Sequence, residues 1–145
     1  MYSNNPILLV EDDDVDAMLT QRALKELNVS NELVHTLNGE DALNYLRNEE
    51  NPTPCLILLD LNMPRMNGFE FLEIAKADSS IKKIPVVVLT TSDLDENVVE
   101  SFNYSVGGYI VKPVDYRQFV EAIKSLNMYW TLSKLPIKEK CTQTT

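Results

Sequence analysis

Short apolar runs separated by helix-like segments constrain the fold of this chain more than any other feature. Five such runs occur, and three of them are continuous rather than alternating with polar residues. A continuous apolar run is typical of a strand that is covered on both faces. We therefore predict strands at residues 7–10, 33–37, 56–59, 86–89 and 109–111.

The segments between these runs carry apolar residues at helical intervals. The second helix is predicted from Asn38 to about residue 46, and the fourth over about residues 93–105. The first helix is expected to follow an N-cap at Asp14 and to turn inward Val15, Met18, Leu19, Ala23 and Leu27. The third is expected to turn inward Phe69, Leu72 and Ala75, and the fifth, beginning at Asp115, Phe119, Val120 and Ile123.

The order of strand and helix, repeated five times, predicts a doubly wound α/β domain. Its strands form one parallel sheet with helices on both faces. We assign residues 1–132 to this domain and residues 133–145 to a C-terminal tail that is mobile in part. Ligands of such a sheet bind beyond the carboxyl ends of its strands. Functional residues are therefore expected directly after the strands.

Charge and composition exclude several classes of function. The formal net charge is −9 and no block of Lys and Arg occurs, so neither nucleic acid nor an anionic membrane is an expected partner. No apolar stretch approaches the roughly 20 residues that span a bilayer. Cys55 and Cys141 form neither a disulfide framework nor a zinc pattern. Together these features predict a cytoplasmic protein.

The residues that follow the strands form a chemically consistent set. Glu11 and Asp12 follow the first strand, Asp60 the third, Thr90 the fourth and Lys112 the fifth. Carboxylates that meet at one edge repel one another unless a cation joins them, and hard oxygen ligands suit Mg²⁺. A hydroxyl and an ammonium supply the remaining groups that a transferred phosphoryl group needs. Asp60, alone at a strand end beside a Pro- and Gly-containing loop, is the best candidate nucleophile.

Four segments of the chain resemble the receiver domains of two-component response regulators. They are Leu8-Leu9-Val10-Glu11-Asp12-Asp13, Asp60-Leu61-Asn62-Met63-Pro64 with Gly68, Val88-Leu89-Thr90-Thr91, and Tyr109-Ile110-Val111-Lys112-Pro113. Each motif alone is weak, but all four in order and at the right spacing are specific. The resemblance implies a flavodoxin-like fold with five helices and a five-stranded sheet in the order 2-1-3-4-5.

The resemblance also implies a metal site and a phosphorylation site. Asp60 would be the phospho-acceptor, with Mg²⁺ (or Mn²⁺ in its place) held by Glu11, Asp12, Asp60 and the backbone carbonyl of Asn62. Thr90 would bind the phosphoryl group, with Lys112 beside it.

Further positions would form the switch and set its timing. Tyr109 would turn inward when Thr90 moves, and Asn62 and Ser92 would tune dephosphorylation. The chain is thus expected to be a stand-alone response regulator that takes its phosphoryl group from a sensor histidine kinase. It would signal by protein contact and catalyse only its own phosphorylation and dephosphorylation.

A weaker likeness points to the regulators that partner bacterial phytochromes. It implies a homodimer through the fourth helix, the fifth strand and the fifth helix, joined by Tyr129 and Trp130. These two aromatic residues would otherwise close the core of the domain.

Two other functions compete with the phosphorylated regulator. An adaptor that works without phosphorylation would not need Asp60 and Lys112 together. A Mg²⁺-dependent phosphohydrolase of this kind requires a second aspartate two residues after its nucleophile, where this chain has Asn62. For single residues, His35 is expected to be structural and Gly68 to be part of a turn.

Overall fold

The computed structural model describes residues 5–61, 68–90, 108–111 and 116–124 of the 145-residue chain. The strands in these residues are β1 (Ile7–Val10), β2 (Leu33–Thr36), β3 (Leu56–Asp60), β4 (Val86–Thr90) and β5 (Gly108–Val111). The helices are α1 (Asp14–Glu26), α2 (Gly39–Arg47), α3 (Gly68–Ala77) and α5 (Tyr116–Lys124). The predicted helix at 93–105 and the predicted tail at 133–145 lie outside the described residues.

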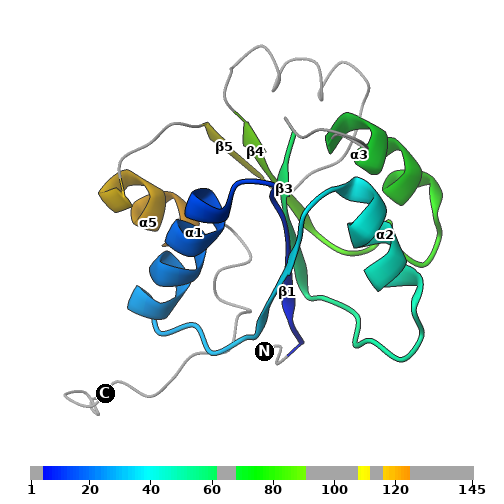
Figure 1. Cartoon of the computed structure of the whole chain (residues 1–145), viewed down its shortest axis with the longest axis horizontal. Helices are drawn as coiled ribbons and strands as arrows, with labels where there is room; N and C mark the ends of the chain where they lie inside the picture. Colours follow the sequence, from blue (N-terminus) through cyan, green and yellow to red (C-terminus); the bar gives the residue numbers. More distant parts are fainter. Residues whose placement is uncertain (1–4, 62–67, 91–107, 112–115, 125–145) are drawn as a thin grey trace.

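The strands form a single parallel sheet in the order β2-β1-β3-β4-β5 (Figure 1). This confirms the predicted α/β class and strand order. Chain order reverses between β1 and β3, because β2 lies on one side of β1 and all later strands lie on the other. In a sheet of this kind the reversal point is where a ligand binds.

The core lies in two layers, one on each face of the sheet. Alternate side chains of each strand enter opposite layers, as the period of a strand requires. In β1, Ile7 and Leu9 pack with α1 and α5, whereas Leu8 and Val10 pack with α2 and α3. Figure 1 shows α1 and α5 on one side of the sheet and α2 and α3 on the other. The central strands β1 and β3 are buried over their whole length, so the residues at their carboxyl ends are firmly placed.

The buried face of α1 differs from the prediction. Val15 and Met18 are 62% and 64% exposed, so the prediction that they point inward is wrong. Ala23 is buried as predicted, and the other buried residues of this helix are Ala17, Thr20 and Leu24. Small side chains allow the helix to approach the sheet closely, and the hydroxyl of Thr20 is accommodated because it donates to the Asp16 carbonyl at 2.9 Å.

The other helices follow the predicted faces more closely. In α5, Phe119, Val120 and Ile123 are buried as predicted. In α3, Leu72 and Ala75 are buried, but Phe69 is only half-buried and Phe71 is the fully buried aromatic. None of the helices in the described part of the chain is long and apolar enough to cross a membrane.

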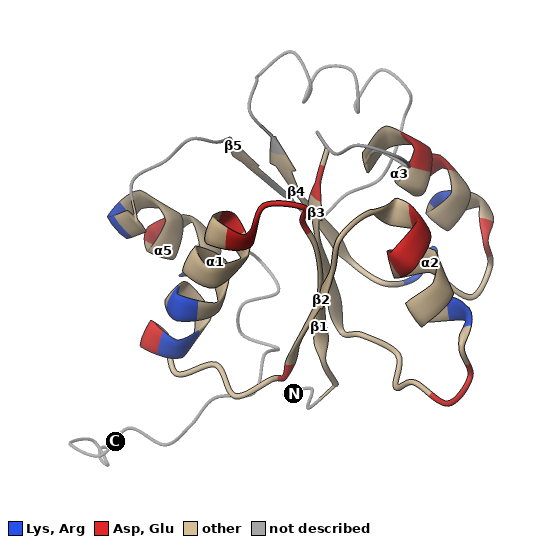
Figure 2. Ribbon diagram, in the orientation of Figure 1, with Lys and Arg blue, Asp and Glu red and all other residues tan. Residues whose placement is uncertain are grey.

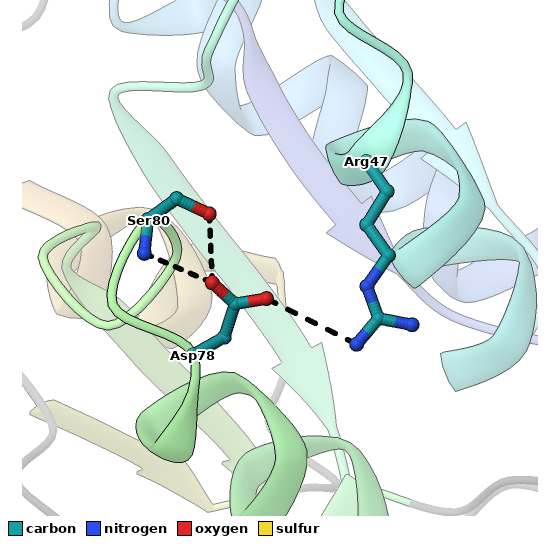
Figure 3. Close-up of polar contacts among 3 residues, drawn as sticks. All are labelled: Arg47, Asp78 and Ser80. Atoms are coloured by element: carbon teal, nitrogen blue, oxygen red, sulfur yellow. Dashed lines mark hydrogen bonds and ion pairs between the residues drawn. The ribbon is translucent and has the colours of Figure 1, made fainter.

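A polar contact joins the ends of α2 and α3. Asp78 accepts from the Ser80 backbone N–H at 2.9 Å and from its hydroxyl at 2.7 Å, and Arg47 lies 3.9 Å from its other oxygen (Figure 3). These bonds, the Ser80 hydroxyl first, lower the pKa of Asp78 from its ordinary 3.8. The ion pair is long and its Arg47 side chain is 56% exposed, so the hydrogen bonds are the stronger part of the contact.

Because the pKa of Asp78 is lowered by folding, the contact stabilises the protein only while the carboxyl is ionised. Asp78→Ala should lower the melting temperature near neutral pH. The difference from wild type should then shrink as the pH falls from 3.8 through the lower folded pKa. Thermal unfolding followed by circular dichroism at a series of pH values measures this difference. If the difference in melting temperature between wild type and Asp78→Ala widened on acidification, the charge of Asp78 would not be the source of the stabilisation of the fold.

Candidate phosphorylation and metal site

Three carboxylates meet at the carboxyl ends of β1 and β3. One ligand oxygen from each of Glu11, Asp12 and Asp60 lies within 4.8 Å of the other two. Glu11 and Asp60 are buried, at 1% and 3% exposed, whereas Asp12 is exposed. Figure 2 shows the acidic segment after β1 beside the acidic end of β3. The site is therefore buried on the side of Glu11 and Asp60 and faces solvent on the side of Asp12.

The register of the sheet explains this convergence. Val10 of β1 is paired with Leu59 of β3, so the next residues along both strands, Glu11 and Asp60, come side by side. Parallel strands end at the same edge, and the two carboxylates therefore meet although they are far apart in sequence. Asp60 closes a five-residue strand that is wholly buried, which fixes the position of its backbone.

Asp13 joins this acidic turn to α1. Its side chain accepts from the backbone N–H groups of Val15 and Asp16 at 2.8 and 3.1 Å, so it is the N-cap of the helix. The prediction that Asp14 is the N-cap is wrong, because Asp14 is the first helical residue. The Asp13 N–H also donates to the Glu11 carboxylate at 3.2 Å. The Asp13 carboxylate is thus used by the cap, whereas Asp12 is the exposed carboxylate that belongs to the cluster with Glu11 and Asp60.

Gly68, at the start of α3, packs directly against the backbone of Asp60 and Leu61. A Cβ at this position would lie 2.7 Å from the Asp60 carbonyl oxygen and 2.5 Å from the Leu61 Cα. The Gly68 N–H donates to the Leu61 carbonyl at 3.2 Å. The role predicted for Gly68, part of a turn, is therefore incomplete, because its missing side chain is what lets α3 approach the end of β3.

The remaining predicted site residues are only partly placed. Thr90 ends β4 and is paired with Val111 of β5, at the edge of the sheet where Asp60 also lies. Tyr109 lies in β5, paired with Val88. Three further predicted residues lie outside the described part of the chain: Asn62, Ser92 and Lys112.

The three carboxylates are chemically suited to a divalent cation. All offer hard oxygen ligands, and their spacing allows one ion to contact oxygens of all three. Carboxylates held this close repel one another, so a cation between them stabilises the fold. Three protein ligands leave positions for water or a phosphoryl oxygen, the arrangement that Mg²⁺ favours.

Comparison with protein families matches residues 7–124 to the response regulator receiver domain. The chain belongs to this family. The receiver domain is the part of a two-component system that is phosphorylated on an aspartate, so the chain is a signalling protein of that kind. The family assignment made from the four sequence motifs is thus confirmed.

Relatives of this receiver domain include phytochrome response regulators. "Response regulator Rcp1" of Synechocystis sp. is 37% identical over 134 residues, which cover 88% of this chain and 91% of that protein. A Mn²⁺-bound form of Rcp1 superposes with a TM-score of 0.76 at 35% identity, covering 89% and 95% of the two chains. A phosphorylated cyanobacterial phytochrome regulator, RcpA, superposes with a TM-score of 0.78 at 37% identity, covering 90% and 99%.

Sequence reasoning missed some contacts of this receiver site. The imidazole of His35 contacts the backbone of Glu11, and nothing local in the sequence links residues 24 positions apart. The close packing of Gly68 had a usable signal, because a glycine at the first position of a helix that follows a functional loop often marks close approach of two backbones. The N-cap was misplaced by one residue within an uninterrupted run of aspartates.

Proposed function

We propose that Asp60 is the aspartate that accepts the phosphoryl group, and that Glu11 and Asp12 hold Mg²⁺ beside it. The observation that carries this proposal is the convergence of the three carboxylates within 4.8 Å. Asp60 is the central member, because it is buried at the end of β3 between β1 and β4. The backbone carbonyl of Asn62 is proposed as a further ligand, and Mn²⁺ as a substitute ion.

The chemistry assigned to Asp60 is nucleophilic. Its carboxylate oxygen forms a bond to phosphorus while the bond from phosphorus to the kinase histidine nitrogen breaks, and that nitrogen keeps the electron pair. Bound Mg²⁺ supplies charge neutralisation at the phosphoryl oxygens. Glu11, held by its backbone and by the Asp13 N–H, keeps its carboxylate turned to the site. The chain transforms no separate substrate and catalyses only the gain and loss of its own phosphoryl group.

The switch residues are proposed from the resemblance to receiver domains and from their positions along the chain relative to the strands. Thr90, at the end of β4, would bind the phosphoryl oxygens, and Lys112, one residue beyond β5, would pair with them. Tyr109 would fill the space that Thr90 leaves. Asn62 and Ser92 would set the lifetime of the phosphorylated state. A phosphoryl group adds charge and three acceptor oxygens, and it shifts the population toward whichever state contacts them better.

The partners are proposed in the same way. The likeness to Rcp1 and RcpA supports a phytochrome-type sensor histidine kinase as the phosphoryl donor. A downstream protein would bind the face formed by the fourth helix, β5 and α5. A homodimer through this face and Tyr129–Trp130 stays a prediction, and so does a cytoplasmic location. The net charge of −9 supports a protein partner rather than nucleic acid or a membrane surface.

Binding of Mg²⁺ should stabilise the folded protein. At a Mg²⁺ concentration ten times the Kd, the gain is about 1.4 kcal/mol, which raises the Tm by roughly 3–7 °C. Asp12→Asn should abolish most of this rise in Tm, because it removes the charge of the exposed ligand. Differential scanning calorimetry with and without Mg²⁺ measures the effect.

Asp14→Asn is the matched control, because Asp14 is exposed on the neighbouring turn and lies outside the three-carboxylate cluster. It should respond to Mg²⁺ as wild type does. An equal rise in wild type and Asp12→Asn would remove Asp12 from the proposed ligands.

A further inference from the structure

The end of β2 binds both backbone groups of Glu11. The Glu11 N–H donates to the Thr36 carbonyl at 3.0 Å. The Glu11 carbonyl lies 2.6 Å from Nε2 of His35. The first bond continues the sheet ladder beyond Val10 and Thr36, which are paired. The second bond is made by a side chain, and it lies where Glu11 and Asp12 leave the sheet.

The chemistry of this contact fixes the donor. A carbonyl oxygen only accepts, so Nε2 of His35 must carry the hydrogen. His35 is paired in the sheet with Leu9, and its ring therefore reaches forward by two residues to meet Glu11. Its side chain is exposed rather than part of either core layer. Packing therefore does not account for a polar ring at this position, whereas the bond to Glu11 does.

The carbonyl that His35 binds belongs to the peptide that joins Glu11 to Asp12. Rotation of this peptide moves both carboxylates relative to Asp60, and a binding site works only when its ligands stay within about 0.5 Å of the productive geometry. On its other side the turn is held by Asp13, whose N–H donates to the Glu11 carboxylate. The imidazole is thus the side-chain restraint on this peptide from the β2 side.

We propose that His35 is a positioning residue for the divalent-cation site. It acts through the backbone of Glu11 and Asp12 and touches neither the cation nor the phosphoryl group. This inference rests on the proposed function, because it assumes that the three carboxylates bind the ion. Partners that orient metal ligands typically change metal affinity by 10–100-fold when they are removed.

Three variants separate positioning from general support of the strand. His35→Leu keeps a side chain of moderate size but removes the donor. His35→Gln places an amide N–H near the position of Nε2 and should restore the bond. Thr36→Val is the control, because the Thr36 hydroxyl also donates from β2 to a backbone carbonyl of β1. That carbonyl belongs to Leu9, at 3.0 Å, and Leu9 lies two residues before Glu11.

The affinity for Mn²⁺ alone provides the first measurement, with free Mn²⁺ followed by electron paramagnetic resonance. His35→Leu should weaken binding roughly ten-fold, and His35→Gln should recover most of the loss. Thr36→Val should bind as wild type does, even though its Tm falls. Equal Mn²⁺ affinity in wild type and His35→Leu would overturn the proposal, and so would an equal loss in Thr36→Val.

The rate of phosphorylation by acetyl phosphate provides the second measurement. His35→Leu should need more Mg²⁺ for half-maximal rate, while its rate at saturating Mg²⁺ stays near that of wild type. A lower rate at saturating Mg²⁺ with an unchanged half-maximal concentration would contradict a positioning role. Failure of the wild type to bind Mn²⁺ at all would instead contradict the proposed function, so the two failures are distinguishable.

Discussion

Asp60→Asn should abolish phosphorylation by acetyl phosphate in the presence of Mg²⁺. The substitution keeps the size of a side chain that is 3% exposed, so the fold should be retained. It replaces an anionic oxygen nucleophile by a neutral amide, which does not form an acyl phosphate. Labelling should fall to background, as measured by retardation of the phosphorylated protein on a phosphate-binding gel.

Asp14→Asn provides the matched control for this experiment as well. It makes the same chemical change on an exposed aspartate outside the cluster, so its labelling should equal that of wild type. Label that persists in Asp60→Asn would move the acceptor to another residue. The competing functions are also separated, because an adaptor would take up no label in the wild type, and a phosphohydrolase would turn over small phosphate esters continuously.

Gly68→Ala should destabilise the protein, although helix propensity alone predicts the opposite. Gly68 is the first residue of α3, and replacing glycine by alanine within a helix usually gains up to about 1 kcal/mol. Here the new Cβ would lie 2.5 Å from the Leu61 Cα and 2.7 Å from the Asp60 carbonyl oxygen, so backbone must move. We expect a loss of about 2 kcal/mol, which lowers the Tm by roughly 4–10 °C.

The same displacement should reach the phosphorylation site. Because the atoms that must move belong to Asp60 and the residue after it, the rate of labelling by acetyl phosphate should fall along with stability. Glu73→Ala is the control, since it introduces the same side chain at an exposed position of the same helix. It should change stability by less than about 0.5 kcal/mol. Thermal unfolding that leaves Gly68→Ala as stable as wild type would refute the packing argument.

The positions of the carboxylates at the ends of β1 and β3 could be predicted from the sequence, because parallel strands have their carboxyl ends at the same edge of a sheet. Once the runs at 7–10 and 56–59 are taken as parallel neighbours, Glu11 and Asp60 must lie at the same edge, and the register of Val10 with Leu59 bears this out. The strand order needed more than the runs themselves. It came from the likeness of four motifs to receiver domains, which the family comparison confirms.

The inward face of α1 did not follow from the sequence, because two stripes compete on that helix. Hydrophobicity favours the larger residues Val15 and Met18, but the sheet accepts Ala17, whose small size permits close packing. A polar residue on the buried stripe, Thr20, hides the correct face further. Its burial depends on a hydrogen bond to the Asp16 carbonyl that only the folded helix supplies.

The contacts that refine the site were harder to predict from the sequence. His35 and Glu11 are separated by 24 positions, and their bond depends on the register of β1 and β2 and on the forward reach of one ring. Position 68 accepts only glycine because α3 packs so closely against the end of β3. Both contacts depend on tertiary distances, and only Gly68 has a local signal, its place at the start of a helix that follows a functional loop.

Mass spectrometry of the intact protein after treatment with acetyl phosphate tests the central claim most directly. With Mg²⁺ present, the wild type should gain the mass of one phosphoryl group, and reduction of the acyl phosphate followed by peptide mapping should place it on Asp60. Removal of Mg²⁺ by a chelator should suppress the gain. A phosphoryl group mapped to any other residue, or one acquired equally well without a divalent cation, would contradict the account.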